Sequence, residues 1–257
     1  MKLHINNETA RLRAVVLGTA ESTGGTPSLD EAYDPKSMEH IKAGTYPKEE
    51  DMIREIEAVA AVFKKYDVEV FRPKVIENYD QIFTRDIAFV IEDKFIKSNI
   101  LPDRDQEIEA IKHVMDKIDP DKIIQLPEEA HIEGGDVMPF GEYILVGTYR
   151  GEDYKDYITA RTNTQAVEVL REIFPDKKVV SFSLKKSNSI ARDNALHLDC
   201  CFQPVGKDKA IIYKEGFLIE AECSWLINLF GEENVYEITR DEMYNMNSNI
   251  FSISEDV

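Results

Sequence analysis

Two polar motifs hold the side chains best suited to acid–base chemistry. Glu133 and Asp136 flank a pair of glycines, whose backbone freedom allows a bulge or a close approach that would aim both carboxylates. His197 and Asp199 are two residues apart, so in a strand they lie on the same face. An imidazole beside a carboxylate suits a general acid/base next to an acid that anchors a substrate. A polar turn and a hydrogen-bonded core histidine are the structural alternatives.

Two arginines are candidates for binding charged groups. Arg85 and Asp86 precede the apolar stretch 87–91. The two residues fit either an ion pair at the start of a strand or a contact with a substrate. Arg161 comes directly before a predicted helix, and a guanidinium can hold a carboxylate through two hydrogen bonds. A surface arginine ahead of a capped helix is the alternative for Arg161.

The cysteines offer neither a metal site nor an evident nucleophile. Cys200, Cys201 and Cys223 have no CxxC or zinc-ligand spacing. The first two lie in an apolar run, where cysteine commonly acts as a small buried side chain. The histidines other than His197 have no partner at ligand spacing. The sequence therefore predicts no metal and no cofactor.

A repeated α/β unit must position these side chains. Apolar residues at helical spacing predict helices at residues 49–65, 103–118, 163–174 and 217–230. Each is followed by a short strand, at residues 68–71, 122–125, 178–181 and 234–237, and then by a polar motif. The first three motifs lead into further β-rich stretches, at residues 93–97, 143–146 and 210–213. Radial arrangement of such units, as in a propeller, brings their polar motifs together at the axis.

We interpret the chain as one domain, residues 1–257, with a lid-like loop at residues 20–47. The unit is used four times, because reference positions in the successive motifs are 50, 63 and 50 residues apart. These positions are Asp86, Asp136, Asp199 and Asn249. After the fourth motif, a strand is expected at residues 247–254.

Charge and hydropathy exclude several classes of partner. The formal net charge is −18 and the pI is about 4.7, whereas nucleic-acid binding needs a basic patch that releases counterions. The N-terminal residues lack the apolar region of a secretory signal, and no stretch is long and apolar enough to span a bilayer. We therefore expect a cytoplasmic protein without nucleic-acid or membrane partners.

The order of the motifs resembles that of the guanidine-modifying enzyme superfamily, the penteins. The string Phe-Thr-Arg-Asp ends at Asp86, Glu-Gly-Gly-Asp begins at Glu133, and His-Leu-Asp begins at His197. The resemblance extends from about Arg11 to the end of the chain. The superfamily includes arginine deiminases, dimethylarginine dimethylaminohydrolases and glycine amidinotransferases. Its fold is a five-bladed, pseudo-fivefold α/β propeller of ββαβ units.

This resemblance implies a role for each candidate residue. Asp86 and Asp199 bind the guanidinium of the substrate. Glu133 orients His197, which transfers protons, and Arg161 matches the arginine that binds the substrate carboxylate. The substrate is then a small guanidino or ureido amino acid, such as arginine, a methylarginine or citrulline. Paired acids match a planar cation with five donors, and no cofactor is needed.

The implied mechanism is covalent, and one component is missing from the sequence. A cysteine thiolate attacks the guanidinium carbon, His197 protonates the departing amine, and a thiouronium intermediate passes to water or to an acceptor amine. In the family this cysteine lies in the fifth unit, whereas the sequence ends at Val257, just after the fourth motif. We therefore expect an incomplete last blade, a C-terminally truncated chain and almost no activity. An amidinotransferase and a non-catalytic binding relative are the alternatives to a hydrolase.

Overall fold

Four separate sheets make up the fold, and three of them share one topology. The computed structural model describes residues 1–257. The three-stranded sheets are β3–β4–β5 (Ala88–Ile91, Lys94–Lys97, Ile123–Gln125), β6–β7–β8 (Val137–Phe140, Tyr143–Thr148, Lys178–Ser183) and β9–β10–β11 (Phe202–Val205, Lys209–Ile212, Val235–Glu237). In each, the first two strands form an antiparallel hairpin and the third runs parallel to the second. The fourth sheet pairs β1 (Ala14–Val16) in parallel with β2 (Glu69–Phe71).

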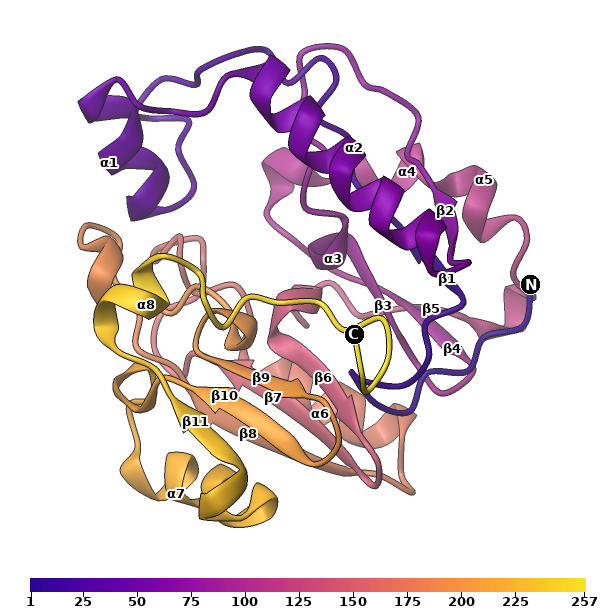
Figure 1. Cartoon of the computed structure of the whole chain (residues 1–257), viewed down its shortest axis with the longest axis vertical. Helices are drawn as coiled ribbons and strands as arrows, with labels where there is room; N and C mark the ends of the chain where they lie inside the picture. The colour runs from indigo at the N-terminus through magenta and orange to yellow at the C-terminus, as the bar shows by residue number, and fades with distance from the viewer.

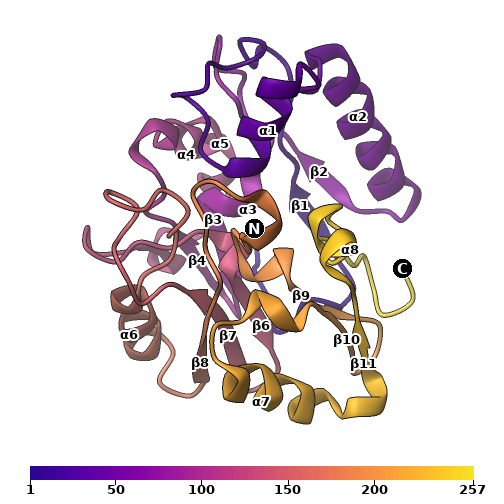
Figure 2. The same ribbon diagram turned by 90° about the vertical axis from the view of Figure 1, so that its left-hand side faces the viewer.

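Helices connect the parallel strands of each sheet, as such a crossover requires. They are α1 and α2 (Pro35–Ala43, Glu49–Lys65) between β1 and β2, α4 and α5 (Glu107–Ala110, Lys112–Met115) between β4 and β5, α6 (Thr164–Ile173) between β7 and β8, and α7 (Glu220–Phe230) between β10 and β11. In Figures 1 and 2, α2, α6 and α7 lie on the outside, whereas the short helix α3 (Thr84–Ile87) lies toward the middle. A last short helix, α8 (Arg240–Tyr244), follows β11. The predicted repeat of helices and strands is confirmed.

Two predicted elements were wrong. The helix predicted at residues 103–118 is broken into a 3₁₀ turn (Pro102–Arg104), α4 and α5. The turn directs Arg104 into the interior, where it is 9% exposed. The strand predicted at residues 247–254 does not form. Its backbone hydrogen bonds are local apart from one between the N–H of Leu12 and the carbonyl of Ile253 (2.8 Å), and one bond does not make a strand ladder.

Apolar faces of the helices pack on the sheets and form the core that holds the polar motifs. One cluster contains Phe182, Phe202 and, from α7, Leu226. Another contains Ile144 of β7 and Leu170 of α6. All five side chains are almost completely buried, as expected for the apolar stripe of a helix against a sheet. None of the helices combines the length and the apolar character that crossing a lipid bilayer requires.

Candidate active site

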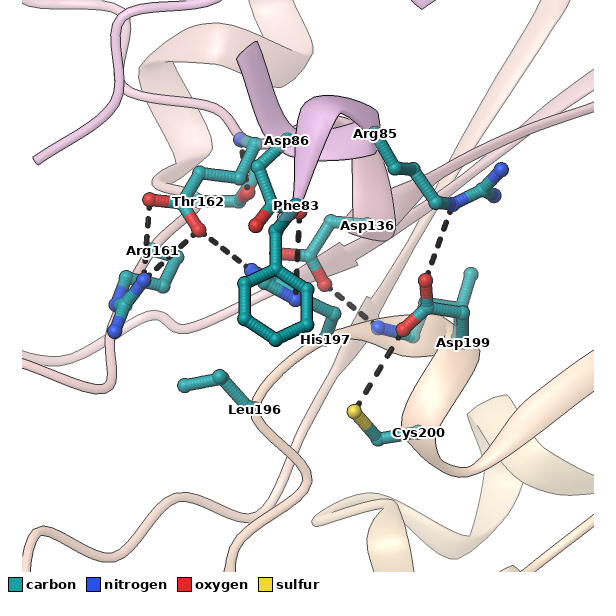
Figure 3. A network of polar contacts seen from close by, with 12 residues as sticks. Phe83, Arg85, Asp86, Asp136, Arg161, Thr162, Leu196, His197, Asp199 and Cys200 are labelled. Atoms are coloured by element: carbon teal, nitrogen blue, oxygen red, sulfur yellow. Dashed lines mark hydrogen bonds and ion pairs between the residues drawn. The ribbon is translucent and has the colours of Figure 1, made fainter. Parts of the chain in front are cut away.

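Three tight turns bring the sequence motifs together. Helix α3 carries Asp86, a 3₁₀ turn at Gly134–Asp136 follows Glu133, and a second at Leu198–Cys200 follows His197. Each turn leads into the first strand of a sheet, and the turns meet in the interior (Figure 3). The four acid–base candidates are at most 7% exposed: Asp86, Glu133, His197 and Asp199. The fold therefore gathers these four sequence-predicted residues into one buried cluster.

The local backbone differs from the strands that the sequence suggested. His197 is extended, but Asp199 lies in the following 3₁₀ turn and not on the same strand face. Asp86 belongs to the helical turn α3 and not to the start of β3. A pleated strand would send successive side chains to opposite faces, whereas these turns allow neighbouring polar side chains to enter one site.

The glycine pair is required by the close approach of neighbouring turns. A Cβ atom on Gly134 would lie 1.9 Å from the carbonyl oxygen of Arg85, and one on Gly135 would lie 2.8 Å from the ring of His197. Glycine is the residue that permits such an approach. The predicted close backbone approach is confirmed, and it brings Glu133 against His197.

Glu133 lies between two cations. Its Oε2 makes a 2.7 Å hydrogen bond with His197 Nε2, and its two oxygens accept hydrogen bonds from Arg161 Nη1 at 3.0 and 3.2 Å. Burial opposes the charge on Glu133, but Arg161 and His197 hold its pKa below the usual value. Burial also opposes the charge on His197, but Asp86 and Glu133 raise its pKa to about 9. His197 is therefore an imidazolium at neutral pH and has a proton to give.

Asp86 is held by Arg104, which no sequence motif had marked. Arg104 Nη1 donates to Asp86 Oδ2 at 2.9 Å, and Arg104 Nε donates to Glu107 Oε1 at 2.7 Å. The other oxygen of Asp86 lies 3.9 Å from His197 Nδ1. Burial raises the pKa of Glu107 to about 7. Arg104 and Glu107 are three residues apart in a predicted helix, a spacing typical of surface ion pairs. Their burial could therefore not be recognised from the spacing.

Asp199 is paired with Arg85 in a similar way. Arg85 Nε lies 3.1 Å from Asp199 Oδ2, and Arg85 Nη2 donates to Glu8 Oε2 at 3.2 Å. Burial raises the pKa of Asp199 to about 6, although Arg85 opposes the shift. Arg85 Nε has no hydrogen bond of good geometry, so its contact with Asp199 is a loose ion pair. Both acids expected to bind a guanidinium thus already contact one from the chain itself.

Arg161 has partners that its expected role did not include. Besides Glu133, it donates from Nε to the carbonyl of Ile158 and from Nη2 to the carbonyl of Tyr33, both at 2.7 Å. Each of the three guanidinium nitrogens therefore already donates within the chain, and at least one N–H, on Nη2, has no partner. Tyr33 belongs to the segment 20–47, which was predicted to be a loop but contains α1, and Arg161 links this segment to the site.

The cysteines have surroundings that keep their thiols protonated. Cys200 Sγ lies 3.6 Å from Asp199 Oδ1, and Cys201 Sγ lies 3.5 Å from the carbonyl of Leu198. Burial, reinforced by the charge of Asp199, raises the pKa of Cys200 well above the usual value, and burial raises that of Cys201. A thiol attacks as its thiolate, so neither residue suits a nucleophile. Cys223 is buried in α7.

Two sets of side chains have possible ligand atoms within 4.8 Å of one another: His197, Asp199 and Cys200, and Asp86, Glu133 and His197. The carboxylates in both sets contact arginines. A cation entering the site has to compete with these guanidinium groups. The same acids are suited to a guanidinium ligand, because a planar cation with several donors can take the place of an arginine.

Several solved structures share this fold over most of the chain. The N-terminal domain of ArgZ, an arginine dihydrolase from cyanobacteria bound to its substrate, is 15% identical with a TM-score of 0.74, over 93% of this chain and 80% of that one. SxtG, an amidinotransferase from Microseira wollei, is 14% identical with a TM-score of 0.72, over 98% and 83%. DDAH from Pseudomonas aeruginosa, complexed with citrulline, is 17% identical with a TM-score of 0.64, over 91% and 79%.

The fold and the motif order define a member of the guanidine-modifying, or pentein, superfamily. Within it, the model of the family described as N,N dimethylarginine dimethylhydrolase, eukaryotic, matches residues 32–257. The chain belongs to this family. YkgA of Bacillus subtilis (strain 168), described as uncharacterized, is 30% identical over 177 residues. That match covers 68% of this chain and 54% of YkgA, so the chain spans about half the length of this relative.

Proposed function

We propose that this chain carries the substrate-binding and acid–base groups of an enzyme that hydrolyses the guanidinium group of arginine or a methylarginine. The main support is that Asp86 and Asp199, both close to His197, already pair with guanidinium groups of the chain. Carboxylates that hold an arginine side chain have the chemistry that a substrate guanidinium needs. Membership of the dimethylarginine dimethylhydrolase family supports the same chemistry.

In the proposed reaction His197 moves protons while Glu133 holds its ring. A cysteine thiolate adds to the guanidinium carbon, and imidazolium His197 gives its proton to the departing amine. Water then adds to the carbon of the thiouronium intermediate, His197 takes a proton from it, and the thiolate leaves. The products are an amine and a ureido amino acid. The 2.7 Å contact between Glu133 and Nε2 leaves Nδ1 on the side of Asp86.

We further propose that Arg161 binds the substrate carboxylate through its remaining N–H on Nη2, while it stays paired with Glu133. The thiolate is expected to come from a cysteine outside these 257 residues, because Cys200 and Cys201 are held as thiols. The 257-residue chain alone is then nearly inactive. The complete fold in this proposal is a five-bladed propeller, with the cysteine in the fifth unit.

Amidino transfer is the second candidate function, since SxtG, described as an amidinotransferase, shares the fold with a TM-score of 0.72. In that reaction an amine takes the place of water at the thiouronium carbon. Adding glycine or lysine to an active full-length protein distinguishes the two, because only a transferase forms a new guanidino compound. A binding relative, the third alternative, would bind arginine and form no product.

Isothermal titration calorimetry with the 257-residue chain tests the binding part of the proposal. L-arginine, N,N-dimethylarginine and citrulline are the ligands. We expect L-arginine or N,N-dimethylarginine to bind, and Asp86→Asn to weaken this affinity at least about tenfold, as loss of a charged hydrogen bond does. The control is Asp105→Asn, since Asp105 is exposed. Failure of the folded chain to bind any of the three ligands contradicts the proposal.

A further inference from the structure

A fully buried aspartate and a partly buried lysine contact the backbone on both sides of His197. Lys186 Nζ donates to the carbonyl oxygen of Leu196 at 2.5 Å, and Asp136 Oδ1 accepts from the N–H of Leu198 at 2.8 Å. We infer that Lys186 and Asp136 are positioning residues that clamp the backbone before and after His197 and so fix where its imidazole lies. The inference rests on the role proposed above for His197.

Packing alone does not explain this pair. Asp136 is 0% exposed and its Oδ2 has no hydrogen-bond partner. Burial raises the pKa of Asp136 and lowers that of Lys186, and among the neighbouring charges each residue is the one that most opposes the shift of the other. Replacing a buried pair of charges by apolar side chains of similar size often costs no stability. A carboxylate kept in the interior near a partly buried lysine therefore points to a positional role.

A glycine makes room for the clamp. A Cβ atom on Gly147, the next-to-last residue of β7, would lie 2.3 Å from Asp136 Oδ1 and 2.9 Å from the Cβ of Leu198. Glycine within a strand weakens the strand and often marks a close approach. Here the missing side chain lets Asp136 reach the N–H of Leu198. Figure 3 shows Asp136 beside His197 with this hydrogen bond drawn.

The charge of Asp136 also affects the pKa of His197. The acids around the imidazole are Asp86, Glu133, Asp136 and Asp199. Three of them are paired with cations: Asp86 with Arg104, Glu133 with Arg161 and Asp199 with Arg85. Asp136 is one of the acids that raise the pKa of His197. Removing the charge of Asp136 should therefore lower the pKa of His197, whereas a residue that only fills space would leave it unchanged.

An NMR titration of the 257-residue chain with labelled histidine provides the test, and His197→Gln identifies the signal of His197. Asp136→Asn keeps an acceptor for the N–H of Leu198 but removes the charge, and should lower the pKa of His197 by about 1 unit or more. Lys186→Met leaves Asp136 without its counter-ion, so Asp136 takes up a proton and the pKa of His197 falls in the same direction.

Binding provides the second readout. Lys186→Met should also weaken the affinity for L-arginine, because the backbone that Lys186 holds leads to Asp199, one of the acids proposed to bind the guanidinium. We expect a loss of about tenfold, the scale of one charged hydrogen bond at Asp199. Lys186→Arg, which keeps charge and donors, should restore the pKa of His197 and the affinity. The matched control is Lys185→Met, because Lys185 is 40% exposed and pairs with Asp193 at 3.0 Å.

The inference is overturned if Asp136→Asn and Lys186→Met lower the melting temperature but leave the titration of His197 as in the Lys185→Met control. If Lys186→Met does not fold, Asp136→Asn and Lys186→Arg decide by the same titration. If the wild-type chain binds no L-arginine, the proposed function fails. The titration of His197 still decides whether the clamp exists, because it requires no ligand.

Discussion

Glu133 and His197 are 64 residues apart in the sequence, and their side chains form a 2.7 Å hydrogen bond in the interior. Arg161 contacts the same carboxylate at 3.0 Å. A buried carboxylate between two cations keeps its charge, and its hydrogen bond to one ring nitrogen fixes the orientation of the imidazole. Glu133 therefore joins the group that transfers protons to the group proposed to bind the substrate carboxylate.

Glu133→Gln should destabilise the fold strongly. The substitution leaves Arg161 and His197 buried without their shared counter-charge, and removing one partner of a buried ion pair costs about 3 to 5 kcal/mol. Urea unfolding at pH 7 measures the change. The control is Glu128→Gln, at an exposed position. An unfolding free energy within about 0.5 kcal/mol of the control would show that the pair contributes little.

The contribution of His197 to stability should disappear at high pH. Its pKa in the fold is about 9, above the reference value of 6.5. The stabilisation is therefore complete below pH 6.5 and is lost as the pH rises through 9, a change on the order of 3 kcal/mol. The free energies of unfolding of the wild type and His197→Gln, measured by urea at pH 6.5 and pH 10, should converge at the higher pH. A difference in unfolding free energy that is the same at both pH values would contradict this prediction.

Binding of L-arginine should strengthen as the pH rises through 6. Asp199 has a pKa of about 6 because of its burial, and only its ionised form attracts a guanidinium. At pH 5 it is mostly neutral, so we expect an affinity about tenfold weaker than at pH 7. Calorimetry in a Glu107→Gln background removes the second group that titrates in this range. In that background, Asp199→Asn should abolish the dependence; a dependence that persists would assign it to another group.

Phe83 should contribute to ligand affinity through its exposed ring. The side chain is 59% exposed, and the carbonyl of Phe83 accepts a hydrogen bond from Arg104 (3.2 Å), the arginine that holds Asp86. An aromatic face attracts a guanidinium by about 0.5 to 1 kcal/mol at exposed sites. Phe83→Ala should therefore weaken L-arginine binding about two- to fivefold. Phe251→Ala, at a residue 49% exposed that packs against Phe63, is the control, and equal affinities of the two variants would exclude the contact.

Cys200 should not serve as the nucleophile. Its thiol is buried beside the carboxylate of Asp199, which disfavours the thiolate. Cys200→Ala should therefore change neither L-arginine binding nor the trace of turnover expected of this chain. The measurement is citrulline formation at high protein concentration. Robust turnover that is lost in Cys200→Ala, but kept in Cys223→Ala, would overturn both this prediction and the proposed inactivity of the 257-residue chain.

The sequence by itself determined the repeating unit and the four acid–base candidates. Helical and strand periodicity are local properties, so the bounds of α2 match the prediction and those of α6 and α7 differ by one to three residues. The glycine pair beside Glu133 is also visible in the sequence itself. Glycines there indicate a backbone that approaches another part of the chain closely, as the structure has it. Motif order then singled out Asp86, Glu133, His197 and Asp199, which the fold brings together.

Only the tertiary structure decided which charges meet. Arg104 belongs to a segment with helical spacing, and nothing in that spacing distinguishes a surface ion pair from the buried contact with Asp86. Glu8 lies 77 residues from Arg85, and Lys186 reaches the backbone beside His197 from a loop after β8. Such pairings depend on distances and burial created by packing units far apart in the chain. Burial also sets the size of each charge interaction, which is why residue types and spacing could name the acids but not their partners.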